Sequence, residues 1–113
     1  MKIIFFLNKT MILLIVIFAS FYHPKFEGRK TANGEIFSNS KLTAAYNQVP
    51  LGSIVEVTNI SNNKSVIVKV NDRCGIDSRI DLSQIAFTSI ANKEKGIIKV
   101  KIKLWIYLIL ITK

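Results

Sequence analysis

The sequence predicts a small, mainly β protein that folds as one barrel-like domain with one or two short helices. Residues 98–104 alternate strictly between apolar and basic side chains, which is typical of a half-buried strand. Residues 54–58 and 65–70 form two further runs rich in β-branched side chains, separated by a turn-forming segment. The chain has 113 residues, half of them apolar, and this length suits one core rather than two.

The first part of the chain, residues 1–20, has the features of an export signal. Lys2 and Lys9 precede the apolar run 11–20, and a basic start followed by an apolar middle is typical of a signal peptide. Phe18 stands where a small residue is preferred if the chain is cut after this segment, so an uncleaved N-terminal anchor is the alternative. We therefore expect export to the periplasm or cell envelope, with membrane contact through this segment left open.

Residues 21–45 are polar and rich in turn-forming residues. The stretch 26–35 has little periodic hydrophobicity, and Asn33-Gly34 is a strong signal for a tight turn. A loop of this length in a small domain is usually functional, although its charges also fit a solvated surface. A second turn is expected at Pro50 and Gly52.

A β-hairpin is predicted for residues 54–58 and 65–70. Every second residue from 66 to 70 is valine, so this strand can be anchored in a core while its end carries Asp72 to the rim of the barrel. An acid in this position is a candidate for an active site. Two structural alternatives are that Asp72 pairs with Arg73 or caps the following turn.

A short helix is predicted from Ser83, a favourable N-cap, to about Ala91. Gly96 is expected to stop this region before the alternating strand 98–104. The apolar tail 105–111 is too short for a transmembrane helix, and it fits an extension of the strand, a membrane contact or an aggregation-prone end. The buried face expected for the helix consists of Leu82, Ile85, Ala86, Ser89 and Ile90.

The chain is strongly basic, with 16 Lys and Arg against 7 Asp and Glu, a net charge of +9. Such an excess favours polyanionic partners, namely nucleic acid, anionic lipid or a bacterial cell wall. No Arg-rich helix, zinc pattern or aromatic RNA-binding signature is present, so nucleic acid is not expected. His23 and Cys74, the single histidine and cysteine, lie far apart in the sequence, so neither a metal nor another cofactor is expected, and no internal disulfide can form.

Several short motifs follow one another along the chain from residue 21 to residue 83. They are Phe21-Tyr22-His23, residues 26–35, Leu42-Thr43-Ala44-Ala45, Pro50-Leu51-Gly52, Val57-Thr58-Asn59, Asn71-Asp72-Arg73 and Ile80-Asp81-Leu82-Ser83. Their order and spacing are similar to those in the rare lipoprotein A family, which the chain resembles over about residues 20–104. The resemblance implies a six-stranded double-psi β-barrel, the fold that expansins also use. We therefore expect residues 1–20 to be the signal or anchor, residues 21–107 the barrel and residues 108–113 an apolar tail.

The resemblance also implies an activity. Members of this family are lytic transglycosylases of the septal ring, which cut peptidoglycan between N-acetylmuramic acid (MurNAc) and N-acetylglucosamine (GlcNAc) and leave a 1,6-anhydro product. By motif position Asp72 is the expected acid and base of this reaction, and Glu35 the second acid. Weaker candidates for binding substrate or holding Asp72 are Thr43, Tyr46, Asn71 and Arg73. The expected partner is a peptidoglycan glycan strand, bound by a monomer.

Two departures from the family pattern keep a second interpretation open. Ser38 stands where many members have an aspartate, and Tyr46 stands where they have a histidine. A tyrosine hydroxyl does not supply a proton near neutral pH as an imidazole does. The two alternatives are therefore an active transglycosylase and an expansin-like barrel that binds glycan without cutting it. A third possibility, the product of a decaying gene, rests on the truncated-looking signal and the apolar tail.

Overall fold

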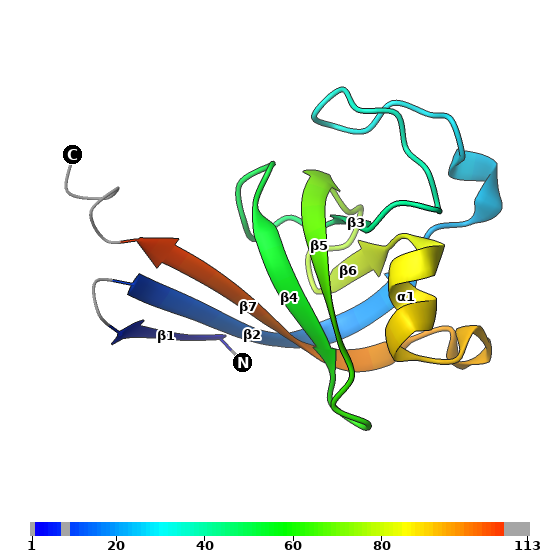
Figure 1. Cartoon of the computed structure of the whole chain (residues 1–113). Helices are drawn as coiled ribbons and strands as arrows, with labels where there is room; N and C mark the ends of the chain where they lie inside the picture. The colour runs from blue at the N-terminus through cyan, green and yellow to red at the C-terminus, as the bar shows by residue number, and fades with distance from the viewer. Residues whose placement is uncertain (1, 8–9, 108–113) are drawn as a thin grey trace.

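The computed structural model describes residues 2–7 and 10–107, which form a closed β-barrel with one α-helix (Figure 1). The ring runs β2-β6-β3-β5-β4-β7 and closes through the β2–β7 pairing. The sequence analysis predicted a mainly β fold with six barrel strands, and the strand order confirms it. The strands are β1 (Lys2–Leu7), β2 (Thr10–Phe21), β3 (Thr43–Ala45), β4 (Ile54–Asn59), β5 (Ser65–Asp72), β6 (Arg79–Leu82) and β7 (Ile98–Tyr107); the helices are α1 (Gln84–Ile90) and the 3₁₀ turns η1 (Pro24–Phe26) and η2 (Lys93–Lys95).

The predicted hairpin and the alternating strand are both present. Strands β4 and β5 pair antiparallel, with Thr58 opposite Ser65 across the turn. In β7 the apolar side chains of Val100, Ile102 and Leu104 are buried, whereas the intervening lysines point outward to different degrees. The core inside the ring is lined mainly by such alternating residues from β2, β4, β5 and β7.

Strand β2 was not expected, because its residues fall in the predicted signal segment 1–20. The structure pairs β2 antiparallel with β7 and parallel with β6, so β2 is the strand that closes the ring. Leu13, Ile15, Ile17 and Ala19 belong to the core cluster. The barrel described here therefore begins at Thr10 rather than at residue 21, and cleavage after residue 20 stays a prediction.

The paired strands β2 and β7 run on beyond the ring, where β1 adds to the edge of β2 (Figure 1). The start of the predicted apolar tail continues β7 as far as Tyr107. Residues 108–113, the rest of that tail, lie outside the described residues. Within the described part of the chain, no helix is long and apolar enough to cross a membrane.

Helix α1 covers one end of the barrel close to its predicted position, but two details of the prediction are wrong. Ser83 makes no side-chain capping bond; instead the side chain of Asn39 accepts from the backbone N–H of Gln84 at 2.9 Å. Ile85 and Ser89, both expected on the buried face, are exposed, and Phe87 is fully buried instead. The cap and the packing both come from segments distant in sequence, which override the local pattern.

Candidate active site

A cavity of about 480 Å³ lies at the end of β5, between the first turn after β2 and the start of β6. Asp72, the last residue of β5, lines it. The pairing of β5 with β3 shifts register here, since Ala44 faces Val70 but Ala45 faces Asp72. Such a bulge re-aims side chains where a strand ends. The cavity is lined by Ser20, Phe21, Tyr22, His23, Lys25, Phe26, Ala45, Asp72, Arg73, Gly75, Arg79 and Asp81.

Three hydrogen-bond donors hold the carboxyl group of Asp72. The backbone N–H groups of Ala32 and Arg73 both donate to Oδ1, each at 2.9 Å. The hydroxyl of Tyr22 donates to Oδ2 at 2.7 Å. The backbone is fixed as well, because the N–H of Tyr46 donates to the carbonyl of Asp72 at 3.0 Å. The acid predicted from sequence is therefore half-buried, oriented and open to a cavity.

The side chain of Arg73 points away from Asp72. Its Nη1 donates to the carbonyl oxygens of Tyr46 at 2.8 Å and Val49 at 2.7 Å. Among the described residues no ion pair joins Asp72 to Arg73. Arg73 thus braces the loop after β3, which supports a role in holding the site rather than in neutralising its acid.

Tyr22 was quoted in a motif but not predicted as a site residue. Its ring stacks on Phe37, with centroids 4.0 Å apart and planes 20° apart, and meets the edge of Phe26 at 5.8 Å. Burial, together with its hydrogen bond to Asp72, raises the pKa of the Tyr22 hydroxyl well above its ordinary value of 10. The hydroxyl is therefore protonated over the whole working range and serves as a donor.

A second carboxyl group, Asp81 of β6, lines the same cavity and was also missed as a site residue. It forms an ion pair with Arg79, with Nε and Oδ1 2.9 Å apart, and accepts a hydrogen bond from the hydroxyl of Ser20. The thiol of Cys74 donates to its Oδ2 at 3.4 Å, and burial raises the pKa of that thiol. Asp81 is thus held in an ion pair, whereas among the described residues Asp72 forms none.

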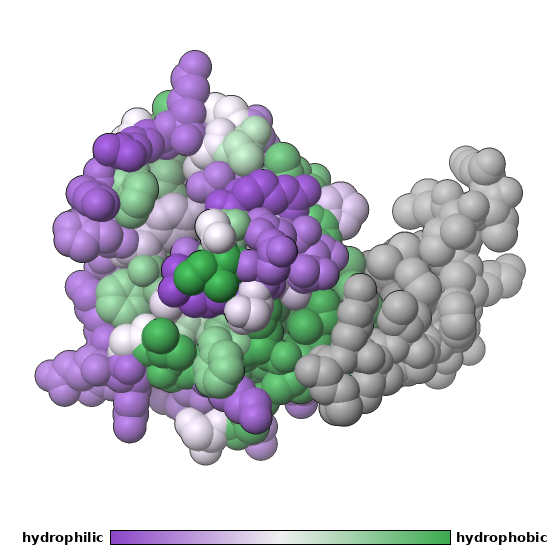
Figure 2. All heavy atoms as spheres, turned by 180° about the vertical axis from the view of Figure 1, so that it is seen from behind, coloured by the Kyte–Doolittle hydropathy of each residue, from purple (hydrophilic) through white to green (hydrophobic). Residues whose placement is uncertain are grey.

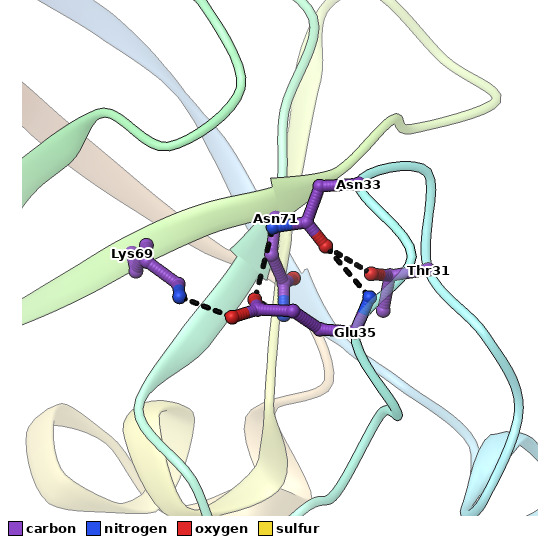
Figure 3. Close-up of polar contacts among 5 residues, drawn as sticks. All are labelled: Thr31, Asn33, Glu35, Lys69 and Asn71. Carbon is purple, nitrogen blue, oxygen red and sulfur yellow. Dashed lines mark hydrogen bonds and ion pairs between the residues drawn. The ribbon is translucent and has the colours of Figure 1, made fainter.

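Glu35 lies in a different polar cluster, on the loop between η1 and β3 (Figure 3). Its carboxylate forms an ion pair with Lys69 and accepts from Asn33 at 3.0 Å and Asn71 at 3.1 Å. The hydrogen bond from Lys69, followed by those from Asn33 and Asn71, lowers the pKa of Glu35 to about 2. Glu35 is ionised at neutral pH and is no proton donor. Lys69, which sequence reasoning missed, shares a face of β5 with Asn71 two residues on.

The cluster around Glu35 borders a second cavity, of about 420 Å³. Asn71 and Thr43, both predicted to bind substrate, line it and are buried. The Oδ1 of Asn71 and the Oγ1 of Thr43 have no hydrogen-bond partner in the part of the chain that the structure describes. Since buried polar atoms are usually paired, two unpaired ones at a cavity mark a place for a polar ligand. The cavity is lined by Glu35, Ile36, Ser38, Lys41, Thr43, Lys69 and Asn71.

The structure therefore separates residues that were expected to form one site. Asn71 and Asp72 are consecutive in β5, so their side chains leave the strand on different sides. Asn71 and Glu35 serve one cavity, and Asp72 serves the other. The loop between them is held down at Ala32, whose N–H binds Asp72, and at Asn33, whose N–H donates to the carbonyl of Asn71 at 3.1 Å.

Tyr46 lies in neither of these cavities. Its side chain is fully buried in the core, its hydroxyl has no hydrogen-bond partner among the described residues, and burial raises its pKa to about 12. Tyr46 instead lines a third cavity, of about 360 Å³, beside β2. Ser38 is the other position that differs from the family pattern. It lines the cavity of Glu35, and its hydroxyl forms a hydrogen bond with the hydroxyl of Ser40 at 2.7 Å.

His23 takes the structural role that its position suggested. Its Nδ1 accepts from the N–H of Lys25 at 3.0 Å and caps η1. Within residues 2–7 and 10–107, no three His, Cys, Asp or Glu side chains gather in a group able to hold a metal ion.

The fold and the cavity define a class of protein, the double-psi β-barrels that present an acid at the end of a strand. The chain belongs to the lytic transglycolase family, whose model matches residues 16–102. The match begins within the segment predicted as a signal and includes the second half of β2.

Proteins with similar sequences support the assignment to this family. The chain is 44% identical over 87 residues to the endolytic peptidoglycan transglycosylase RlpA of Haemophilus influenzae, covering 75% of this chain and 30% of that one. An RlpA of Rickettsia bellii is 47% identical over 91 residues, covering 76% and 40%. The chain thus spans less than half of these transglycosylases. It matches an uncharacterized protein of Synechocystis, ssl3177, over 91% of its length at 48% identity and over 74% of this chain.

Solved structures share the barrel. The Streptomyces papain inhibitor superposes with a TM-score of 0.67 at 26% identity, over 82% of this chain and 94% of the inhibitor. An expansin of Clavibacter michiganensis, crystallised with cellohexaose, superposes with a TM-score of 0.60 at 18% identity, over 79% of this chain and 48% of the expansin. The expansin likeness concerns the fold alone.

Proposed function

We propose that this protein is an endolytic peptidoglycan transglycosylase that cuts the MurNAc–GlcNAc bond of peptide-stripped glycan strands, with Asp72 as its acid and base. The observation that carries the proposal is the position of Asp72, oriented by three donors at the mouth of a cavity. The family match and the RlpA relatives support the substrate class. Peptidoglycan lies in the cell envelope, so the protein is proposed to work there.

In the proposed reaction one carboxyl group acts twice, first as an acid and then as a base. Protonated Asp72 gives its proton to the glycosidic oxygen, and the bond from that oxygen to C1 of MurNAc breaks. The 6-hydroxyl of the same MurNAc attacks C1 and returns its proton to the Asp72 carboxylate, so a 1,6-anhydro ring forms and no water is consumed. Ionised Glu35 binds or polarises the sugar and does not enter the proton transfer.

The cavity beside Glu35 is proposed to hold the neighbouring part of the strand. Asn71 and Thr43 offer unpaired polar atoms to sugar hydroxyl and acetamido groups. Lysines 41 and 69 contribute positive charge to the same cavity. Exposed hydrophilic side chains surround an apolar area on the face seen in Figure 2, and with a net charge of +9 they suit an anionic wall polymer.

The test is a digest of purified peptidoglycan, intact and peptide-stripped, analysed by mass spectrometry for anhydro-muropeptides. It uses the full chain, because β2 belongs to the barrel. Asp72→Asn should abolish the anhydro products. Asp77→Asn is the matched control, since Asp77 is exposed and lies outside both cavities.

A non-catalytic glycan-binding barrel is the second candidate, favoured by the position of Tyr46 outside the cavities of Asp72 and Glu35 and by serine at position 38. In that case the parent chain and Asp72→Asn would both sediment with peptidoglycan, and neither would produce anhydro ends.

A further inference from the structure

We propose that Tyr22 is the positioning residue of this site, and that it selects Oδ2 of Asp72 as the oxygen that carries the proton. This inference rests on the proposed function, because the proton transfer belongs to that reaction. The inference adds to the proposed reaction a residue, Tyr22, and the specific oxygen of Asp72 that carries the proton.

The two oxygens of Asp72 have different environments. A carboxylate oxygen has two lone pairs that can accept hydrogen bonds. Both lone pairs of Oδ1 are used by backbone N–H groups, those of Ala32 and Arg73. Among the described residues Oδ2 accepts only from the hydroxyl of Tyr22, which leaves its second lone pair for the substrate.

Tyr22 is held more firmly than a surface tyrosine. Phe37, which is 2% exposed, stacks on its ring, and Phe26 meets the ring at its edge with planes 83° apart. Its backbone is fixed from two sides: its N–H donates to the carbonyl of Leu82 at 3.0 Å, and its carbonyl accepts from Gln84 at 2.9 Å. The hydroxyl is therefore delivered to Oδ2 at a fixed angle, and its raised pKa keeps it a donor.

Removing this hydroxyl takes away the donor that fixes Oδ2 of Asp72, while the backbone N–H groups of Ala32 and Arg73 still hold Oδ1. Without that donor Oδ2 is less precisely placed for proton transfer. We expect Tyr22→Phe to lower kcat about 10- to 100-fold, the loss typical of a hydrogen bond to a charged group, with KM little changed.

The experiment compares Tyr22→Phe with Tyr46→Phe in the full chain. Both variants remove one tyrosine hydroxyl, but that of Tyr46 is buried in the core without a partner. The kcat and KM for release of anhydro-muropeptides are measured, and the carboxyl ¹³C chemical shift of Asp72 is recorded by NMR in each protein. Unfolding in urea shows that each variant is folded.

The expected result is that only Tyr22→Phe lowers kcat and changes the carboxyl ¹³C chemical shift of Asp72. An unchanged chemical shift of Asp72 in Tyr22→Phe, or an unchanged kcat, would overturn the positioning role. If the parent chain forms no anhydro product, the proposed function fails, and the ¹³C chemical shift still decides whether Tyr22 contacts Asp72.

Discussion

Removing β2 is the most informative perturbation, because the same residues were predicted to be a signal and are observed as a barrel strand. A chain that begins at Phe21 lacks Leu13, Ile15 and Ile17, which are 7%, 8% and 9% exposed in the core. Burial of each such side chain contributes about 1.5–3 kcal/mol, so the three together contribute about 5–9 kcal/mol. A domain of this size has a total stability of about 5–15 kcal/mol.

The truncated chain is therefore expected to be unfolded or barely folded. It also loses the β-ladders that β2 forms with β6 and β7, and with them the closure of the ring. The matched control begins at Thr10: it lacks β1, which pairs only with β2 outside the ring, and it should keep the barrel. The stability of both truncated chains is measured by urea unfolding, followed by circular dichroism. Equal midpoints and equal slopes for the two chains would refute the reasoning and show that β2 is dispensable.

Three further predictions follow from single contacts. Replacing Lys69 by methionine should raise the pKa of Glu35 from about 2 toward 4.5, as read from its carboxyl ¹³C signal; in the parent chain the ion pair stabilises the fold fully above about pH 4.5, and this contribution is lost as the pH falls to about 2. Asn39→Ala should lower the free energy of unfolding by about 1 kcal/mol through loss of the α1 cap. Ser83→Ala should cost less, because Ser83 does not cap the helix, and a larger loss would contradict this account. Tyr46→Phe should change stability by no more than about 1 kcal/mol in urea, since it removes a buried hydroxyl without a partner.

Patterns of period two predicted the elements that they cover. The alternation in residues 98–104 became β7, and the valines at even positions from 66 to 70 became the core face of β5, with Asp72 at its end. Such patterns are local, and they predict strands correctly because each strand has one face toward solvent and one face toward the core.

The signal-like segment shows where local patterns fail. A continuous apolar run fits a signal peptide and a strand that is buried on most of its surface equally well. The deciding contact is the pairing of Ala19 with Ile98, nearly at opposite ends of the chain, and no local pattern reports it. The prediction that Ile85 is buried was wrong because contacts distant in sequence determine which face of α1 is buried. These contacts are the cap from Asn39 and the packing of α1 on the barrel.

The candidate site was predicted in part. Asp72 and Glu35 could be identified from motifs, yet their separation into two cavities depends on how the loop around Ala32 lies over the end of β5. Tyr22, which follows directly after β2, and Asp81 of β6 both line the cavity, and the closed barrel brings them to Asp72. Their roles are properties of the assembled ring rather than of any short stretch of sequence.

The closure of the ring between β2 and β7 has a consequence for how the protein is made. Thr10 pairs with Tyr107, so the last gap in the barrel closes only after β7 has been synthesised. Contacts this distant in sequence form slowly, because the loop between them must be ordered first. Until then the chain stays open, and the apolar β2 is exposed to aggregation.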